Sequence, residues 1–344
     1  MLQPLDARMI GDVVAPLLGA DLDAIAQVRK GRNNQIFRVA AGGREFAIKH
    51  YPPQTSDRRD RLAAEYRALS FLHAHGVRNV PTPIARSDLA RVAVYEWVDG
   101  HTPRAGERGG GDLAGFFVQL LTLRERALSS DIGLASASCL SLSEAIQQLK
   151  MRREALREVE LGHADLAEYL RGFDEASAQT VARAVSTAHD AGIEPSTPLP
   201  ASLRCLSPSD FGFHNALVRA DGDLVFLDFE YFGWDDPVKA VADIMLHPGM
   251  ELSHEDGVEA YNAIANALAG EDRRFRERFE LFYPICALIW CLIILNEFLP
   301  VYATRREAAG AFDGGKSEML TQQLAKADRR LHKVAHGNEH AITA

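Results

Sequence analysis

The spacing of apolar residues changes near residue 98, and this change restricts the fold more than any other feature of the sequence. Before it, segments rich in β-branched and aromatic residues predict strands over 36–39, 45–49 and 91–95. A helix is expected between the second and third strands, at about 57–75. After residue 98, apolar residues recur mostly at helical spacing. The pattern therefore predicts an α+β fold, with a small β-rich part followed by a larger, mainly helical part.

We expect these two parts to form two lobes. The N-terminal lobe spans 1–98 and opens with a helix over about 7–27. The stretch 99–112 is polar and glycine-rich, which is typical of a hinge or flexible connection. The C-terminal lobe spans 99–344, including that hinge, with strands near 215–219 and 224–228. Its helices are predicted at 112–127, 143–158, 164–171, 174–190, 237–246, 255–268, 272–299 and 315–335.

Composition and charge exclude several classes of protein. The 344 residues carry a net charge of -9, which argues against an extended nucleic-acid surface. The four cysteines show no CxxC pairing or metal-ligand spacing, so we expect reduced thiols in a cytoplasmic protein. The N-terminus lacks the pattern of a signal peptide. The longest apolar run, 285–295, is shorter than the roughly 20 residues of a bilayer span, so we expect a buried helix and no membrane partner.

The spacing of Asp210, Asn215 and Asp228 matches the needs of phosphoryl transfer. Asp210 could orient or deprotonate an attacking hydroxyl, while Asn215 and Asp228 could hold Mg²⁺ against nucleotide phosphates. A turn at 220–223 predicts a hairpin that brings Asp228 back toward Asn215. The alternative is a surface hairpin capped by Asx residues. Glu230 would share a face with Asp228, and could orient it or a basic residue instead.

The N-terminal lobe supplies candidates for holding a nucleotide. Lys49 ends an apolar strand and could bind phosphate oxygens, with Glu65 on the following helix as its ion-pair partner. Asn33 and Asn34 lie in a turn whose backbone N–H groups could cover phosphates, although a plain hairpin turn fits them nearly as well.

Just before the lobe junction, we expect an adenine edge to bind the main chain of Glu96 and Val98. Because this recognition uses backbone groups, the nucleotide could be GTP as well as ATP.

Asp236 and Pro237 are typical of a helix start, as an N-cap followed by proline at the first helical position. Asp243, two turns further along that helix, could reach back toward the site.

Together these motifs resemble the aminoglycoside phosphotransferase/choline kinase family, whose members are small-molecule kinases with a protein-kinase-like fold. The resemblance runs from about residue 28 to 247 and includes the stretch 228–237. It implies that Asp210 is the catalytic-loop aspartate and that Asn215 and Asp228 bind metal. It also implies that Lys49 and Glu65 are the phosphate-binding pair, and that the two-lobed fold is kinase-like.

Two departures from the family pattern stand out. Pro208-Ser209 replaces the family's His-Gly before the catalytic Asp, which puts the geometry of that loop in question. Lys239 stands where many relatives carry an acidic residue.

Two histidines near these motifs carry no assigned role. His214 has no ligand partner at metal spacing, and His247, followed by Pro248, is expected to end a helix.

The leading hypothesis is therefore an ATP- and Mg²⁺-dependent kinase acting on a hydroxyl of a small molecule. A nucleotide-binding regulatory module without transfer activity is the alternative, and a protein kinase is disfavoured by the short 228–237 stretch. Aminoglycoside-, amino alcohol-, sugar- and nucleoside-like acceptors all stay open, as does the oligomeric state. The acidic net charge would suit a cationic acceptor. Trp290 and Glu297 share a helical face and could wall the acceptor site, or could simply pack and face solvent.

Overall fold

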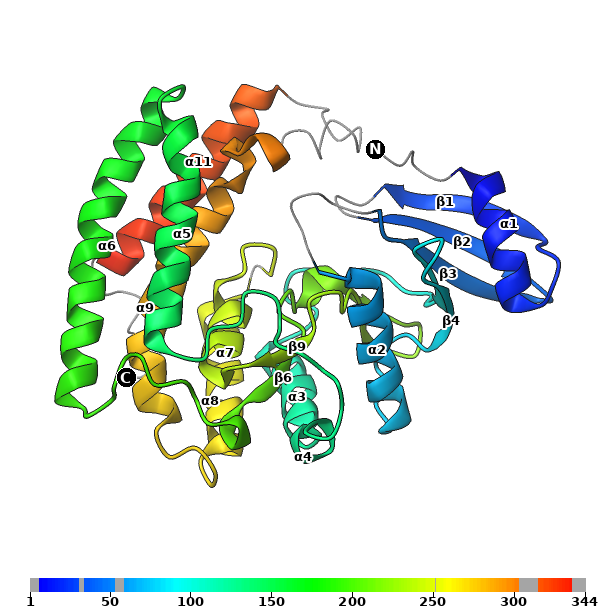
Figure 1. Cartoon of the computed structure of the whole chain (residues 1–344), viewed down its shortest axis with the longest axis horizontal. Helices are drawn as coiled ribbons and strands as arrows, with labels where there is room; N and C mark the ends of the chain where they lie inside the picture. Colours follow the sequence, from blue (N-terminus) through cyan, green and yellow to red (C-terminus); the bar gives the residue numbers. More distant parts are fainter. Residues whose placement is uncertain (1–5, 31–33, 53–58, 251, 303–314, 336–344) are drawn as a thin grey trace.

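The computed structural model describes residues 6–30, 34–52, 59–250, 252–302 and 315–335. It has the two lobes expected from the sequence (Figure 1). An antiparallel sheet forms one end of the molecule, and the helices α5, α6 and α11 form the other. The helix α2 (Arg61–Ala74) and the small sheets of the catalytic region lie between them.

The N-terminal sheet has five strands in the order β1-β2-β3-β5-β4, all antiparallel. Three of them were predicted. Their bounds, with those of the two others, are β1 Ala24–Lys30, β2 Gln35–Ala41, β3 Arg44–His50, β4 Pro83–Ser87 and β5 Val92–Glu96.

The predicted opening helix over 7–27 is too long. The helix α1 (Ala7–Leu18) ends at Gly19, which takes the left-handed conformation that glycine adopts without a steric cost, and β1 follows. β1 was missed because it lies at the sheet edge and most of its described side chains face solvent, so it lacks apolar alternation. β4 was taken for an extended connection because of Pro83, its first residue, and Pro81 just before it.

The two faces of the N-terminal sheet have different tasks. On one face, Phe46 and Ile48 of β3 pack against Ile10 and Val14 of α1 in a separate small core. Because side chains alternate along a strand, Lys49 points to the other face, toward α2 and the C-terminal lobe. The strand pattern thus places a cation on the side of the cleft.

The C-terminal lobe is built around α9 (Phe275–Ile294), which is buried along nearly its whole length. Around it pack α5, α6, α7 and α11. Two predictions were wrong in this region: 164–171 and 174–190 are a single helix that continues through Gly172, and the helix predicted over 112–127 is broken by a turn at 122–123. The helices are α3 Gly110–Leu121, α4 Arg124–Ala127, α5 Leu142–Glu160, α6 Ala164–Asp190, α7 Pro237–Leu246, α8 His254–Leu268, α9 and α11 Lys316–Ala335.

The stretch from α9 through the 3-10 turn η3 (Leu295–Phe298) is long and apolar enough to cross a membrane by length and composition alone, but most of it is buried inside the lobe. This agrees with the expected buried helix. The four cysteines are buried free thiols.

The glycine-rich end of the predicted hinge has a packing role. Gly110 already lies in the first turn of α3, and a Cβ placed on it would lie only 1.8 Å from the backbone oxygen of Asp256 on α8. Gly100 similarly approaches the backbone oxygen of Val218. These glycines therefore allow two backbones to approach closely.

Two small sheets position the catalytic segments. β6 (Cys205–Ser207) pairs with β9 (Gly233–Asp235), and β7 (Ala216–Val218) pairs with β8 (Leu224–Phe226). The segment 208–215 leaves β6, and Asp228 follows β8. The predicted turn at 220–223 is confirmed, since the Arg219 N–H donates to the Asp223 carbonyl. Each small sheet thus delivers one of the two candidate aspartates to the cleft.

Candidate active site

Lys49 lies at the centre of an ion-pair network that joins the two lobes. Its Nζ is 2.6 Å from Oε2 of Glu65 and 2.5 Å from Oδ1 of Asp228. Burial lowers the pKa of Lys49, but the surrounding carboxylates of Asp228, Glu65 and Glu230 outweigh it and raise the pKa well above its ordinary value. Lys49 is therefore a fixed positive charge. The predicted pairing of Lys49 with Glu65 is present in the structure.

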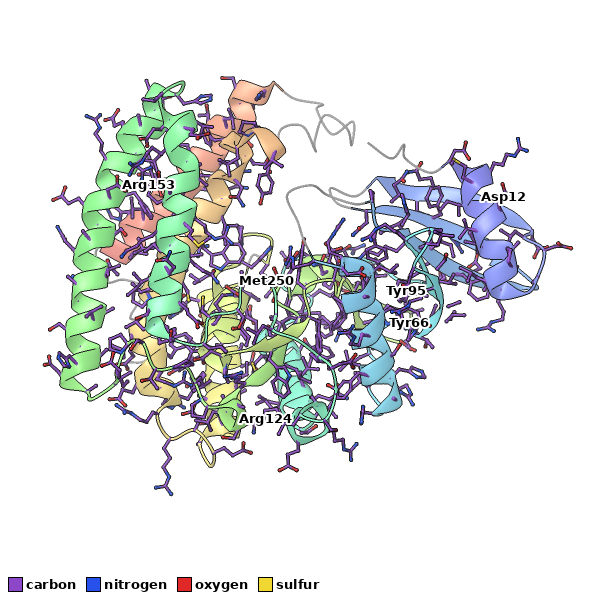
Figure 2. The ribbon with its side chains drawn as sticks, in the orientation of Figure 1. Asp12, Tyr66, Tyr95, Arg124, Arg153 and Met250 are labelled. Carbon is purple, nitrogen blue, oxygen red and sulfur yellow. The ribbon has the colours of Figure 1, made fainter. Side chains whose placement is uncertain are left out.

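Glu65 is held by more than its ion pair. The Tyr51 hydroxyl donates to Oε2 of Glu65 at 2.8 Å, and the backbone N–H of Phe229 donates to its other oxygen at 3.3 Å. Tyr51 also shares a hydrogen bond with Tyr95 of β5, which lies close to α2 (Figure 2). These contacts fix the carboxylate that orients Lys49 and tie α2 to the segment after β8.

Glu230 contacts basic and amide groups of the N-terminal lobe. Its carboxylate accepts from Asn34 Nδ2 at 2.8 Å and from Arg61 at 3.3 Å, and lies 3.9 Å from Lys49. It is 2% exposed. Of the two predicted phosphate-turn residues, Asn34 is thus a partner of Glu230, whereas Asn33 lies outside the described residues.

The charges of this buried cluster do not balance among the described side chains. Three carboxylates (Glu65, Asp228 and Glu230) face two cations, Lys49 and Arg61. Burying uncompensated negative charge is costly, so a further cation would stabilise the cluster. This imbalance is the first sign that a metal ion fits here.

Asn215 and Asp228 also have the right chemistry and placement for Mg²⁺. The Leu227 N–H donates to the Asn215 carbonyl at 2.8 Å, which brings the two residues side by side at the end of the hairpin. The Asn215 amide nitrogen donates to the backbone oxygen of Asp210, and none of the described groups donates to the side-chain oxygen of Asn215. Amide and carboxylate oxygens are the hard ligands that Mg²⁺ prefers. These residues therefore fit the metal that the motif implies.

Asp210 is held by two stacked histidines. Its Oδ1 is 2.9 Å from Nε2 of His214 and 3.3 Å from Nε2 of His247, whose rings are parallel with centroids 3.9 Å apart. The Gly249 N–H donates to Nδ1 of His247, so Nε2 carries the proton that is given to Asp210. Burial raises the pKa of Asp210, but these hydrogen bonds outweigh it and leave the pKa below its ordinary value.

The departure Pro208-Ser209 is accommodated by the loop. Ser209 has φ 65°, in the left-handed region that glycine favours. Its hydroxyl donates within 3.3 Å of the backbone oxygens of Ser136 and Tyr231, and its N–H donates to Ser207. Serine thus keeps a conformation suited to glycine, and Asp210 still enters the cleft.

The predicted adenine-binding edge lies where the lobes join. Glu96 ends β5, and its carboxylate accepts hydrogen bonds from Thr82 and from Arg219 of the C-terminal lobe. Val98 follows outside the sheet, and its N–H donates to no other described residue. Its main chain is therefore available to a ligand, while the Glu96 side chain bridges the lobes.

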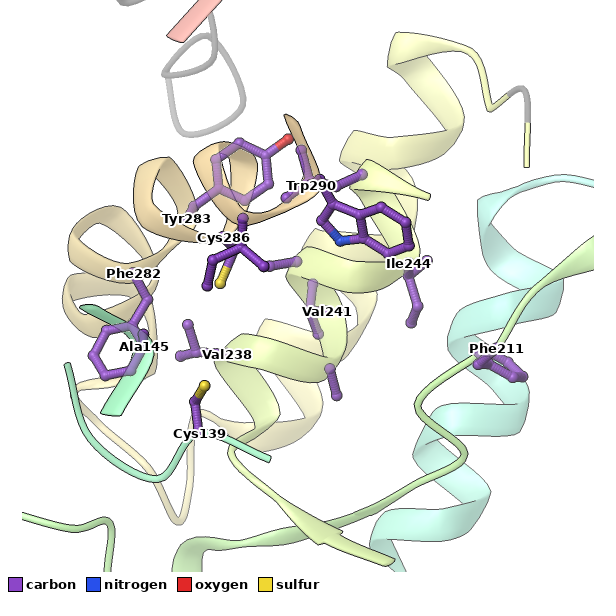
Figure 3. Packing of buried hydrophobic residues seen from close by; sticks show 14 of the residues in the cluster. Cys139, Ala145, Phe211, Val238, Val241, Ile244, Phe282, Tyr283, Cys286 and Trp290 are labelled. Atoms are coloured by element: carbon purple, nitrogen blue, oxygen red, sulfur yellow. The ribbon is translucent and has the colours of Figure 1, made fainter. Parts of the chain in front are cut away.

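Beside Asp210, a cavity of about 280 Å³ opens between α5, α7 and α9. Trp290 and Asp243 both line it, and the indole Nε1 donates to Oδ1 of Asp243 at 2.9 Å. Trp290 also packs toward Ile244 of α7 (Figure 3), so it lines the cavity and belongs to the packing between the helices. Glu297 is buried in η3 and is not among the described residues of this cavity. A larger cavity of about 420 Å³ lies between α11 and the α7–α8 connection, apart from every predicted site residue.

Sequence reasoning missed three contributors to the site. His247 does end α7 as expected, but it also contacts Asp210, and His214 joins it. Arg152 of α5 lines the cavity beside Asp210. The spacing of Gln148 and Arg152 on one face of α5 was the available signal, although helical spacing alone does not show what that face meets.

Comparisons with known proteins show the family to which the chain belongs. The phosphotransferase enzyme family matches residues 24–279. No curated protein matches the chain by sequence.

Solved structures resemble it over nearly their full length. A choline kinase from Cryptosporidium parvum Iowa II has a TM-score of 0.58 at 11% identity, with 92% of this chain and 91% of that chain covered. The spectinomycin phosphotransferase APH(9)-Ia, solved with ADP and its antibiotic, has a TM-score of 0.57 at 14% identity, with 93% and 99% covered. A gentamicin complex of APH(2")-IIa has a TM-score of 0.56 at 16% identity, with 96% and 97% covered.

The fold and the family match together define the class: the chain has the protein-kinase-like fold that aminoglycoside phosphotransferases and choline kinases share. The chain belongs to the phosphotransferase enzyme family. At these identities the neighbours establish the fold and leave the acceptor open.

Proposed function

We propose that this protein is a small-molecule kinase that transfers the γ-phosphoryl group of ATP to a hydroxyl group in a Mg²⁺-dependent reaction. The observation that carries the proposal is the meeting of Asp210, Asn215, Asp228, Lys49 and Glu65 in one cleft from four separate segments. Neighbours solved with ADP or ATP bind nucleotides in the same fold, which supports ATP as the donor. We further propose that the protein works in the cytoplasm.

The residues divide the work between positioning and charge stabilisation. Asp210 would accept the acceptor's hydroxyl proton on its carboxylate, which His214 and His247 hold in place and keep ionised. Asn215 and Asp228 would hold Mg²⁺. Lys49, oriented by Glu65, would bind phosphate oxygens, and the main chain of Val98 would bind the adenine edge. When bound, ATP would supply the phosphoryl group: the bond from its γ-phosphorus to the ADP oxygen would break, the acceptor oxygen would bond to that phosphorus, and Mg²⁺ would shield the negative charge of the phosphates.

A coupled ADP-release screen over hydroxylated metabolites and aminoglycosides tests the proposal. Asp210→Ala serves as the blank and should lose turnover while still binding nucleotide. Asp221→Ala, in the exposed turn of the same hairpin, is the matched control and should retain activity. Full activity of Asp210→Ala would refute the assigned role. Nucleotide binding without ADP release for any acceptor would favour the regulatory module instead.

A further inference from the structure

The charges around the acceptor cavity are mostly neutralised by partners within the protein. Asp210 is engaged by two histidines. Asp243 accepts from Trp290 and forms an ion pair with Lys239, one turn before it on α7. The described lining thus contains no carboxylate free to receive a cationic group of an acceptor. This is unexpected for a protein whose net charge suggested cationic acceptors.

Arg152 is different, because it has no partner of its own among the described residues. It lies on the face of α5 that lines the cavity and is half-buried. No carboxylate lies within ion-pair distance of its guanidinium, and no described group hydrogen-bonds to it. Burial lowers the pKa of Arg152. The nearby Tyr302, Asp243 and Cys139 offset this only in part, so Arg152, without an ion pair among the described residues, loses hydration that these neighbours do not fully replace.

The neighbouring Arg153 shows the contrast. It turns to the other side of α5, toward α6 (Figure 2), and is paired with Asp174 at 2.7 Å and Glu160 at 2.9 Å. These two consecutive arginines therefore face opposite sides of α5 and differ in their ion pairs. Arg153 forms ion pairs with two carboxylates of the protein, whereas the guanidinium of Arg152 faces the cavity beside Asp210 without an ion pair among the described residues.

We propose that the acceptor is an anionic hydroxylated metabolite, and that Arg152 binds its phosphate or carboxylate group while a hydroxyl reaches Asp210. The guanidinium presents a planar fork of donors that matches either anion. The positive charge of Arg152 disfavours choline-like and polyamine-like acceptors. Asp243 would not attract such cations, because it is already paired with Lys239 and Trp290. This inference rests on the proposed kinase function and narrows its substrate class.

The rest of the cavity fits a small polar acceptor. Its volume of about 280 Å³ lies near the lower end of the roughly 300–1,000 Å³ of ligand pockets. Ser136, Gln148 and Asn296 add hydroxyl and amide groups to its lining, and these suit further hydroxyls on the acceptor. A sugar acid, a sugar phosphate or a hydroxy acid meets these requirements.

Matched acceptor pairs that differ only in the anionic group test the inference. The probes are D-glycerate against glycerol, L-homoserine against 3-aminopropanol, and glucose 6-phosphate against glucose, each assayed by ADP release. We expect turnover with an anionic member and little with its partner. Arg152→Gln should raise the acceptor KM about tenfold or more and leave the KM for ATP unchanged. The acceptor KM of Arg152→Lys should lie between the values of the wild type and of Arg152→Gln. Arg153→Gln is the matched control and should keep the wild-type acceptor KM.

A binding measurement decides the case in which no probe is turned over. Inorganic phosphate should raise the melting temperature of the wild-type protein saturated with ADP and Mg²⁺, and should not do so for Arg152→Gln. Equal shifts in both proteins would overturn the inference. So would efficient turnover of a neutral or cationic acceptor with a KM that Arg152→Gln leaves unchanged. That last result would uphold the proposed kinase function and reject the anionic class of acceptor. Failure of this inference can therefore be distinguished from failure of the proposed function.

Discussion

The nucleotide side and the acceptor side of the cleft are organised in opposite ways. On the nucleotide side, Lys49, Glu65, Asp228, Glu230 and Arg61 form one buried network that spans both lobes. On the acceptor side, Asp210 and Asp243 are engaged within the C-terminal lobe, whereas Arg152 has no ion-pair or hydrogen-bond partner among the residues that the structure describes. In the proposed function, the first arrangement would bind a nucleotide, a ligand common to many enzymes. The second would leave the charge of Arg152 to select a particular acceptor.

The difference implies that matched mutations on the two sides affect different properties. Removing a member of the nucleotide-side network leaves buried charge uncompensated, so stability and catalysis both suffer. Removing Arg152 breaks no hydrogen bond or ion pair among the described residues, so acceptor binding should change much more than stability. The predictions below compare the two sides, from the largest expected effect to the smallest.

The largest difference between the two sides is expected in the free energy of unfolding, when one arginine on each side is replaced. Arg61→Leu leaves the 2%-exposed Glu230 without its arginine, and should lower the free energy of unfolding by about 3–5 kcal/mol. Arg152→Leu, the matched change on the acceptor side, should alter it by no more than about 0.5 kcal/mol. Urea denaturation of both variants measures this. Similar losses in the two variants would show that the two sides do not differ as described.

Lys49→Met should reduce kcat/KM by roughly 10²–10³, about 2.7–4 kcal/mol, because it removes a fixed charge that acts on the transferred phosphoryl group. Steady-state kinetics with the best acceptor from the screen gives this value. Lys150→Met, on the exposed surface of α5, is the control and should match wild type. A purely structural Lys49 would instead leave kcat/KM of the folded fraction unchanged.

Trp290→Phe removes one hydrogen bond, from the indole to Asp243, and keeps an aromatic ring in the cavity wall. Asp243 retains its ion pair with Lys239, so we expect a loss of about 1 kcal/mol in the free energy of unfolding. Thermal or urea unfolding measures the change. A loss of several kcal/mol would mean that the ring itself, rather than the hydrogen bond, holds α9 against α7.

The smallest effect at neutral pH is expected from His247→Asn, and it should grow as the pH falls. The two histidines hold the pKa of Asp210 below its ordinary value, so wild-type Asp210 stays ionised well into the acid range. Losing the His247 donor raises that pKa, which moves the acid limb of the kcat/KM profile to higher pH. His189→Asn, exposed on α6, is the control. An unchanged acid limb would mean that Asp210 does not govern it.

Much of the nucleotide side could be predicted from the sequence, and little of the acceptor side could. Lys49 and Glu65 were found because strand alternation and helix position carry local signals, and Asp228 because a turn returns it to Asn215. The pairing of Glu230 with Arg61 joins residues 169 positions apart, which no local pattern reports. Arg152 was missed for a related reason: it lines the cavity without an ion pair among the described residues, and that depends on how α5, α7 and α9 pack.

The fold shows the same limit. The prediction of two lobes held because apolar spacing changes sharply, whereas β1 was missed because an exposed edge strand has no apolar face. The glycines at 109–111 suggested flexibility, yet Gly110 is required by the close approach of α3 to α8. Glycine in a sequence does not by itself distinguish mobility from tight packing.

The central claim is that Asp228 serves the metal–nucleotide side while Asp210 serves the acceptor side. Isothermal titration calorimetry with a non-hydrolysable ATP analogue, with and without Mg²⁺, tests it most directly on wild type, Asp210→Ala and Asp228→Ala. We expect Mg²⁺ to strengthen nucleotide binding in wild type and Asp210→Ala equally, and to have no effect in Asp228→Ala. An Mg²⁺ effect that persists in Asp228→Ala, or that disappears in Asp210→Ala, would contradict the division of roles.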